Sequence, residues 1–349
     1  DSAPGHLLDA ETLGAERAIA RLGTLPGTVL LDAEALPWCE VPAATPPSRP
    51  LAARQFLTLI ERDWQASSYS ALARHIDTRS GRLLRQPELR AETVAASPAQ
   101  EHDIFNFPRG ARHGSFLHAL FEGLDFAAPA DATAHAGLIS RALQHAGYAA
   151  DWLPALQQLL DDVLDCALDD DALRLRSLQG SSGRHAVELG FEFPLAPFDT
   201  ARLDALLAAH DPLARAAPAL AFARVRGMLS GFIDLVFECR GRYYVVDYKS
   251  NHLGNTFADY APAHLAHSIA EHRYDLQYAL YTLALTRLLR QRLGETFDYE
   301  RHVGGVYYLY LRGMRAAAGA RHGVWYARPA RELIEALDAL CSGGDGDDN

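Results

Sequence analysis

The chain has 349 residues, of which 49% are hydrophobic and 22% charged, a composition that excludes wholesale disorder. No apolar run approaches the ~20 residues of a membrane helix, and the net charge of −11 disfavours a protein that coats nucleic acid non-specifically. The 4 cysteines form no CxxC pair, so we expect neither a disulfide framework nor a zinc ribbon, and we expect a reducing, cytoplasmic compartment.

The first half of the chain is predicted to consist of a linker followed by helices. Residues 1–55 are rich in Ala and Pro and are interpreted as a linker or the remnant of a preceding domain. Residues 56–180 are expected to be mainly helical. Their apolar spacing predicts amphipathic helices over 133–147 and 151–168, after a glycine-containing loop that enters a helix at about Ser115.

The second half changes to strands, and residues 181–341 are predicted to form the catalytic core. The segments AVELGFEFPL, GMLSGFIDLVFEC, GRYYVVDYKS and GGVYYLYLRG are rich in Val, Phe, Tyr and Ile, and a short turn at Arg240–Gly241 predicts a hairpin. A helical stretch over 257–293 and a closing helix complete the core, and the acidic tail 342–349 is expected to be disordered. The fold class predicted from these elements is α/β (α+β), with a mixed central sheet flanked by helices.

Two strand-like segments carry the strongest candidates for catalytic residues. Asp234 lies in GFIDLVF and Asp247 in VVDYKSN, so the predicted hairpin brings both carboxylates to one end of the sheet. Asp247 and Lys249 are two residues apart on a strand and therefore share a face. Lys249 is the only lysine among 33 basic residues. A P-loop requires a lysine in the motif GxxxxGK[ST], whereas Lys249 lies in DYKSN. We therefore expect no ATP site in this chain.

This combination of residues is typical of a metal-dependent phosphodiesterase. Two close carboxylates repel each other unless a cation lies between them, and Mg²⁺ is the usual partner of one or two carboxylates and phosphate oxygens. A bound metal stabilises charge on a scissile phosphate, and a nearby lysine orients water or steadies the developing charge. Glu188, in the preceding strand, is a candidate third carboxylate.

Four segments resemble motifs of the RecB family of nucleases. GMLSGFIDLVFECRGRYYVVDYKSNHLG resembles the nuclease motif, and FNFPRGARHGSFLHALFEGLDF resembles the histidine motif. HRYDLQYALYTLAL resembles the Gln–Tyr motif, and GGVYYLYLRG resembles the closing strand. The resemblance runs from about Trp64 to the final helix. It implies a restriction-endonuclease-like PD-(D/E)XK core within a nuclease domain over residues 56–341.

The resemblance implies a set of metal ligands and one catalytic lysine. By position, the ligands would be His118, Asp234, Asp247 and the backbone carbonyl of Tyr248. Asp234 and Asp247 would also be catalytic carboxylates. Lys249 would be the catalytic lysine, and the metal would be Mg²⁺.

Further residues are implied around this set. Glu188 matches the early acidic position of the family and would be catalytic. Gln277 and Tyr281 match the Gln–Tyr pair, share a helix face, and would position DNA or the active site. Arg109 and Arg112 lie beside the histidine motif and are candidate DNA contacts. Some related nucleases carry an iron–sulfur cluster held by four flanking cysteines, but the cysteines here do not bracket the motif, so we expect no cluster.

The implied activity is that of a Mg²⁺-dependent deoxyribonuclease of the exodeoxyribonuclease V type. It would cut, as an exonuclease and endonuclease, single strands unwound from duplex DNA during double-strand-break processing and recombination repair. Full-length family members also carry an ATP-dependent helicase, so we expect this chain to be the C-terminal nuclease portion. The implied partners are RecC-like and RecD-like subunits and the RecA recombinase, with no membrane.

Two other functions fit the same motifs. The domain could be a docking module that holds partner subunits and recruits the recombinase, with little activity of its own. It could also be a standalone repair or defence nuclease of the same fold. The complete set of Asp234, Asp247 and Lys249 argues against an inactive module, and the start of the chain at Asp1 argues against a standalone enzyme.

Overall fold

The computed structural model describes residues 64–69, 72, 102–126, 132–170, 172–178, 184–220 and 224–343, together with Thr24. Apart from Thr24, these residues fall in one compact unit, residues 60–349. The predicted linker over 1–55, apart from Thr24, and the tail beyond Gly343 lie outside the described residues. In the part of the chain that is described, no helix is long and apolar enough to cross a membrane.

The described chain contains both strands and helices. The strands are β1 (Trp64–Ser67), β2 (His185–Asp199), β3 (Arg224–Cys239), β4 (Arg242–Lys249), β5 (Val303–Tyr310) and β6 (Val324–Ala327). The α-helices are α3 (Ala111–Glu122), α4 (Ala132–Ala146), α5 (Leu153–Asp165), α6 (Thr200–His210), α7 (Pro212–Ala216), α8 (Pro262–Glu271), α9 (Tyr274–Leu293), α10 (Tyr299–His302) and α11 (Arg331–Ser342). The short 3-10 helices are η4 (Ala150–Trp152), η5 (Leu175–Leu178), η6 (Phe257–Tyr260), η7 (Gly294–Thr296), η8 (Leu311–Gly313) and η9 (Ala316–Arg321).

The described strands form one mixed six-stranded sheet built around the long strand β3. One edge of β3 pairs antiparallel with β2 along most of its length. On the other edge, β1 pairs with residues 226–229 and β4 with residues 235–239, which leaves residues 230–234 between them. β4 then pairs parallel with β5, and β5 pairs antiparallel with β6. The predicted mixed sheet is confirmed, and its long central strand carries Asp234.

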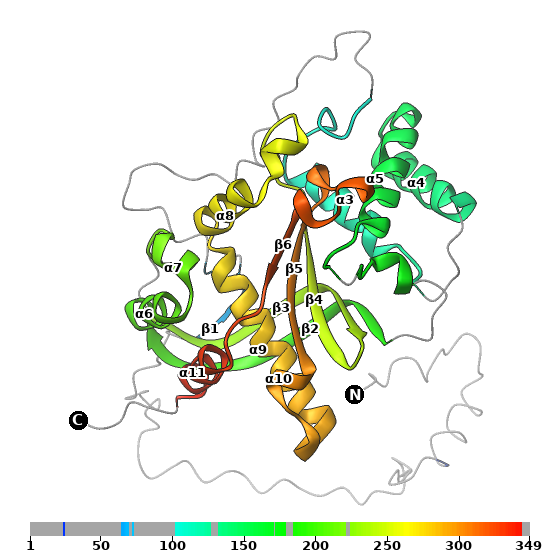
Figure 1. Cartoon of the computed structure of the whole chain (residues 1–349). Helices are drawn as coiled ribbons and strands as arrows, with labels where there is room; N and C mark the ends of the chain where they lie inside the picture. The colour runs from blue at the N-terminus through cyan, green and yellow to red at the C-terminus, as the bar shows by residue number, and fades with distance from the viewer. Residues whose placement is uncertain are drawn as a thin grey trace, which may run out of the picture. The chain divides into compact units, whose positions relative to one another are not determined.

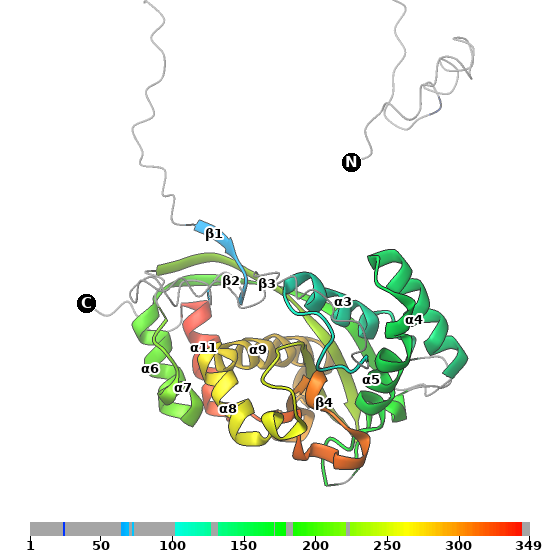
Figure 2. The same cartoon turned by 90° about the horizontal axis from the view of Figure 1, so that it is seen from above.

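Helices cover both faces of this sheet (Figures 1 and 2). α8, α9 and α11 lie on one side, and α3, α4 and α5 lie on the other. All eight residues of β5 are buried, as expected for a strand covered on both faces. Most of α9 is buried as well, including Leu276, Leu280 and Leu283, which fits its lack of a polar face. The sheet and α9 therefore form the rigid frame on which the candidate site is built.

The hairpin and most of the predicted elements are present, with some differences. Arg240 and Gly241 both have positive φ, the conformation of a tight two-residue hairpin turn. The helical stretch expected over 257–293 is divided into η6, α8 and α9, and the break falls at Arg273, whose φ is +55°. β1 and β6 were not predicted, because strands of four residues are too short to show a clear alternation.

A buried arginine joins the loop before α3 to the end of β4. Arg312 is 1% exposed and donates hydrogen bonds to the carbonyl oxygens of Ile104 at 2.6 Å, Phe107 at 2.9 Å and Pro108 at 2.9 Å. Its Nε also donates to the carbonyl of Ser250 at 3.2 Å. Because these carbonyls are inside the protein, Arg312 supplies donors that water cannot. It thereby sets the position of α3 relative to β4.

We predict that Arg312→Met lowers the free energy of unfolding by about 2–4 kcal/mol, because it removes charged hydrogen bonds and leaves buried carbonyls without a donor. Urea denaturation followed by circular dichroism measures this change. The exposed Arg321 provides the matched control, and Arg321→Met should change the stability by no more than ~0.5 kcal/mol. Equal effects of the two substitutions would contradict this role of Arg312.

Candidate active site

The two predicted carboxylates lie where β3 and β4 separate. The pairing of these strands ends at Leu235 and Val246, and the same register would place Asp234 opposite Asp247. Instead of a backbone ladder bond, the Asp234 carboxylate accepts the backbone N–H of Tyr248 at 2.8 Å. The Asp234 side chain thus satisfies a backbone donor at the point where the strands part. This fork brings both aspartates to one place, as the sequence predicted.

Asp247, Lys249 and Gln277 form a closed, buried triangle. The Lys249 ammonium lies 2.7 Å from Asp247 Oδ2 and donates to Gln277 Oε1 at 2.6 Å. The Gln277 amide completes the triangle by donating to Asp247 Oδ1 at 3.0 Å. Asp247 is 4% exposed and Lys249 6% exposed. Burying a charged pair is unfavourable unless its remaining hydrogen-bonding atoms are satisfied, and Gln277 does this for both partners.

Aromatic side chains enclose the lysine. The ammonium lies 3.6 Å from the centre of the Tyr274 ring and 4.5 Å from that of Tyr308. The Tyr308 hydroxyl lies 3.0 Å from Gln277 Oε1, and the Gln277 amide donates to the Tyr281 hydroxyl at 3.0 Å. Gln277 and Tyr281 therefore act as one hydrogen-bonded pair, as their spacing predicted. Sequence reasoning missed both Tyr274 and Tyr308.

Burial and neighbouring charges at the fork shift the pKa of Asp247 and the pKa of His118. Burial raises the pKa of Asp247 to about 6; the Lys249 ammonium opposes this rise, and the Asp234 carboxylate adds to it. For His118, burial alone lowers the pKa, but the hydrogen bond and charge of Asp234 outweigh it, so the pKa lies above its ordinary value. Two carboxylates therefore face one permanently charged basic group, Lys249, at the fork, and a bound cation would lower the repulsion between them.

Helix α3 lies on the other face of the sheet from α9 and contributes His118 to the fork. His118 Nδ1 lies 3.4 Å from Asp234 Oδ2. Phe121, from the same helix, stacks on the Tyr248 ring with a centroid distance of 4.6 Å and fixes α3 against β4. Glu122 follows His118 by one helical turn and shares its face. Burial raises the pKa of Glu122, and the charges of Glu188 and Asp234 raise it further. Glu122 is a carboxylate near the fork that sequence reasoning missed.

Glu188 approaches the same region from β2. It falls between two residues that pair with Leu235 and Ile233, so it lies across from Asp234. Its φ of +49° is rare for a residue other than glycine, asparagine or aspartate. Such strain within a strand often marks a functional position. The structure thus gathers Glu188, Glu122 and Asp234 on the side of His118.

These donors fit a divalent metal by their chemistry. In the arrangement observed, no three His, Cys, Asp or Glu side chains of the described residues meet closely enough to hold one. Asp247 Oδ2, however, is buried and accepts no directed hydrogen bond; its partner is the Lys249 ammonium. A cation satisfies such an oxygen, and Asp234 and His118 offer an oxygen and a nitrogen ligand across the fork. Tyr248, whose backbone carbonyl is the fourth expected ligand, directly follows Asp247 in the sequence.

The two predicted arginine contacts have different environments. Arg109 donates to Asn255 Oδ1 at 3.4 Å and remains exposed. Arg112 donates to the carbonyl oxygen of Ala146 at 2.6 Å, at the end of α4, and lies over the Tyr148 ring. Arg112 therefore holds α3 against α4. Of the two, Arg109 retains the freer guanidinium for a ligand.

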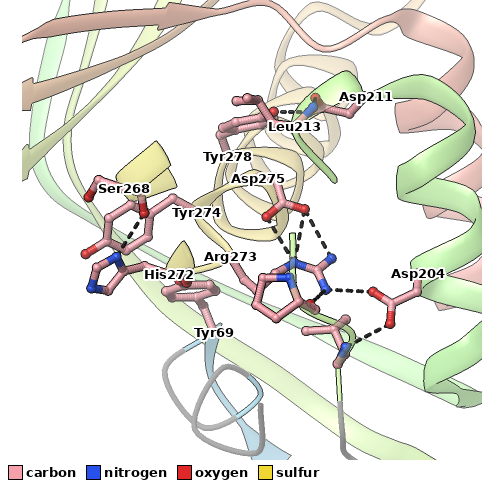
Figure 3. A network of polar contacts seen from close by, with 12 residues as sticks. Tyr69, Asp204, Asp211, Leu213, Ser268, His272, Arg273, Tyr274, Asp275 and Tyr278 are labelled. Atoms are coloured by element: carbon pink, nitrogen blue, oxygen red, sulfur yellow. Dashed lines mark hydrogen bonds and ion pairs between the residues drawn. The ribbon is translucent and has the colours of Figure 1, made fainter. Parts of the chain in front are cut away.

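A second buried network fixes the start of α9, which carries Gln277 (Figure 3). Arg273 is 1% exposed, and its guanidinium donates to Asp275 at 3.1 Å, to Asp204 at 2.7 Å and to the carbonyl of Pro218 at 2.8 Å. Asp275 is itself fully buried. The left-handed conformation of Arg273 turns the chain between α8 and α9, and the network holds that turn.

Comparisons with known proteins identify the family of the chain. A family model described as the PD-(D/E)XK nuclease superfamily matches residues 90–342. The chain is 40% identical over 284 residues to the RecBCD enzyme subunit RecB of Escherichia coli (strain K12), which covers 80% of this chain and 23% of that protein.

Two further relatives carry the same name. The chain is 32% identical over 305 residues to the RecBCD enzyme subunit RecB of Haemophilus influenzae, which covers 82% of this chain and 24% of that protein. It is 36% identical over 331 residues to the RecBCD enzyme subunit RecB of Mycobacterium tuberculosis (strain CDC 1551 / Oshkosh), which covers 83% of this chain and 30% of that protein. The chain therefore spans 23% to 30% of the length of these three relatives.

We predict that Arg273→Met lowers the free energy of unfolding by about 3–5 kcal/mol, because it leaves Asp275 buried and unpaired. In a double-mutant cycle, adding Asp275→Asn should recover more than ~1 kcal/mol of that loss. Thermal and urea unfolding measure the cycle. Arg290→Met, which breaks a partly exposed ion pair with Asp338, serves as the control and should cost less than ~1 kcal/mol. Strict additivity within the cycle would rule out the coupling.

Proposed function

Because the chain belongs to the PD-(D/E)XK nuclease superfamily, we propose that it is a RecB-type nuclease domain that hydrolyses phosphodiester bonds of DNA with Mg²⁺. The observation that carries this proposal is the fork of β3 and β4, which brings Asp234 and Asp247 together beside the buried Lys249. Two carboxylates and an ammonium at one point are the groups that metal-assisted phosphodiester cleavage requires.

The metal would be held by His118, Asp234, Asp247 and the backbone carbonyl of Tyr248. When bound, Mg²⁺ would polarise the scissile phosphate and lower the pKa of bound water. Lys249 would donate a hydrogen bond to the attacking water or to the phosphate oxygen on which charge develops. Glu188 and Glu122 are acidic groups on the side of His118 that could take up a proton during the reaction.

Gln277 and Tyr281 would act by positioning. Gln277 contacts both Asp247 and Lys249, so it sets the distance between the carboxylate and the ammonium. Tyr281 holds the Gln277 amide in the orientation that makes both contacts possible. Arg109, on the exposed loop before α3, would contact a phosphate of the incoming strand.

The substrate would be a single strand unwound from duplex DNA, cut as an exonuclease and endonuclease during double-strand-break processing. The net charge of −11 supports delivery of that strand by partner subunits better than capture of duplex from solution. We propose RecC-like and RecD-like subunits as those partners, an ATP-dependent helicase as the remainder of the protein, and RecA as the recombinase loaded onto the product.

We predict that this chain degrades end-labelled single-stranded DNA in Mg²⁺, and that EDTA abolishes the activity. Asp247→Ala should lower the rate by ~100-fold or more, because it removes a metal ligand and the partner of Lys249. Gel electrophoresis of the labelled products measures the rate.

The exposed Asp151 provides the control, since Asp151→Ala removes a carboxylate far along the sequence from the fork and should leave the rate unchanged. Degradation that resists EDTA would contradict metal-dependent cleavage. A folded chain that shows no cleavage in Mg²⁺ would instead mean that the site needs its helicase and partner subunits, or that the domain is a docking module that holds partners and recruits the recombinase.

We also predict a pH dependence that follows Asp247. A metal ion and a proton compete for this carboxylate, whose pKa is raised to about 6. At limiting Mg²⁺, the cleavage rate should therefore rise about tenfold per pH unit below pH ~6 and level off above it. Saturating Mg²⁺ should move the rise to lower pH. Single-turnover rates at both metal concentrations measure this shift, and a rise that does not respond to Mg²⁺ would exclude Asp247 as its origin.

A further inference from the structure

The ammonium of Lys249 is surrounded on several sides by groups of known position. Asp247 Oδ2 and Gln277 Oε1 lie 2.7 Å and 2.6 Å from it. The rings of Tyr274 and Tyr308 lie on other sides, at 3.6 Å and 4.5 Å from their centres. The ammonium therefore has two oxygen partners and two aromatic faces, and only 6% of the residue is exposed.

These surroundings restrain an otherwise flexible side chain. A lysine has a four-carbon stem and loses much of its rotamer freedom when it is held in one position. A cation over a tyrosine face is attracted to the ring, more strongly when water is excluded. Two such faces can offset the loss, and they leave the ammonium little space in which to move sideways.

Tyr274 is itself braced from several directions. The Tyr308 hydroxyl donates to the carbonyl oxygen of Tyr274 at 2.9 Å, so the two tyrosines beside the ammonium also hold each other in place. The Tyr274 hydroxyl donates to Asn251 Oδ1 at 3.3 Å, two residues beyond Lys249. On its other side, the His272 ring stacks on Tyr274 with a centroid distance of 5.2 Å.

The backbone at Tyr274 is fixed as well. Tyr274 is the first residue of α9 and directly follows Arg273, whose buried ion pairs hold the turn between α8 and α9 (Figure 3). Tyr274 also lies three residues before Gln277, so it shares that helix face. One rigid helix end therefore presents both the ring and the amide to the same ammonium.

We propose that Tyr274 is a positioning residue that holds Lys249 at the reaction centre, with Tyr308 as the second wall of an aromatic enclosure. This role rests on the proposed nuclease function and adds a residue to its site. Tyr274 acts through Lys249 and does not itself contact the scissile phosphate. Without the ring, the lysine would sample other rotamers and would be aligned for only part of the time.

The sequence offers an unusually direct test, because Lys249 is the only lysine of the chain. In protein labelled with ¹³C-lysine, the NMR spectrum should contain one lysine side-chain signal. The rings of Tyr274 and Tyr308 should shift its ε-CH₂ resonance upfield from that of free lysine. Tyr274→Leu should move the resonance back toward the free value, and Tyr274→Phe, which keeps the ring, should not.

The same variants should differ in catalysis. Tyr274→Leu should lower kcat about 10- to 100-fold, since a small misplacement of a catalytic group is this costly. The KM for single-stranded DNA and the Mg²⁺ concentration at half-maximal rate should change less than twofold, and Tyr274→Phe should restore most of kcat. Tyr326→Leu, a matched change at a tyrosine 46% exposed on β6, should alter neither the resonance nor the rate.

The outcomes separate this proposal from the proposed function. An unshifted lysine resonance in the unaltered protein, or one that does not respond to Tyr274→Leu, would overturn the enclosure whether or not the chain cuts DNA. A resonance that moves while kcat stays constant would overturn the positioning role and leave the nuclease function intact. A shifted resonance in a chain that has no nuclease activity, either alone or with its partner subunits, would refute the catalytic role and the proposed function together. If Tyr274→Leu does not fold, Tyr274→Met, which fills the volume without a ring, takes its place.

Discussion

The burial of the Asp247–Lys249 pair is the constraint on which the site depends. An ionised carboxylate and an ammonium lose several kcal/mol of hydration each when they leave water, and their attraction offsets this only if their other atoms are satisfied. Gln277 therefore bonds to both charges, and two tyrosine faces take the place of water around the ammonium. These contacts hold the pair in place. The pKa of Asp247 is still raised, because burial disfavours its charged form by more than the Lys249 ammonium favours it.

The fold supplies these partners from distant parts of the chain. β4 carries the charged pair, and β5 lies beside it in parallel register, so Tyr308 falls next to Asp247. The crossover between these two strands contains α9, which brings Gln277 and Tyr274 to the same point. Two buried arginines stabilise the arrangement from outside the triangle: Arg273 fixes the start of α9, and Arg312 fixes the loop that leads to α3.

The electrostatics of the fork connect metal binding to substrate binding. Asp234, Asp247, Glu188 and Glu122 place negative charge around a site proposed to receive a phosphodiester, with His118 and Lys249 as the nearby basic groups. An anionic strand would be repelled from such a site until a divalent cation neutralises the carboxylates. In the proposed function, the metal would therefore be needed for substrate binding as well as for the chemistry, and a strand delivered by partner subunits would fit such a site.

The sequence alone determined the class of fold, the hairpin, the carboxylates Asp234 and Asp247, and Lys249, because these follow from local patterns: apolar strands, a two-residue turn and a spacing of two along a strand. The family motifs also indicated His118, Glu188, Gln277 and Tyr281. Only the tertiary structure decided that Asp234 accepts the backbone N–H of Tyr248 and that Arg112 donates to the end of α4. It also decided that Tyr274 and Tyr308 enclose the lysine. These contacts join residues from different elements. Their geometry depends on how strands separate and helices pack, which no spacing within a single segment encodes.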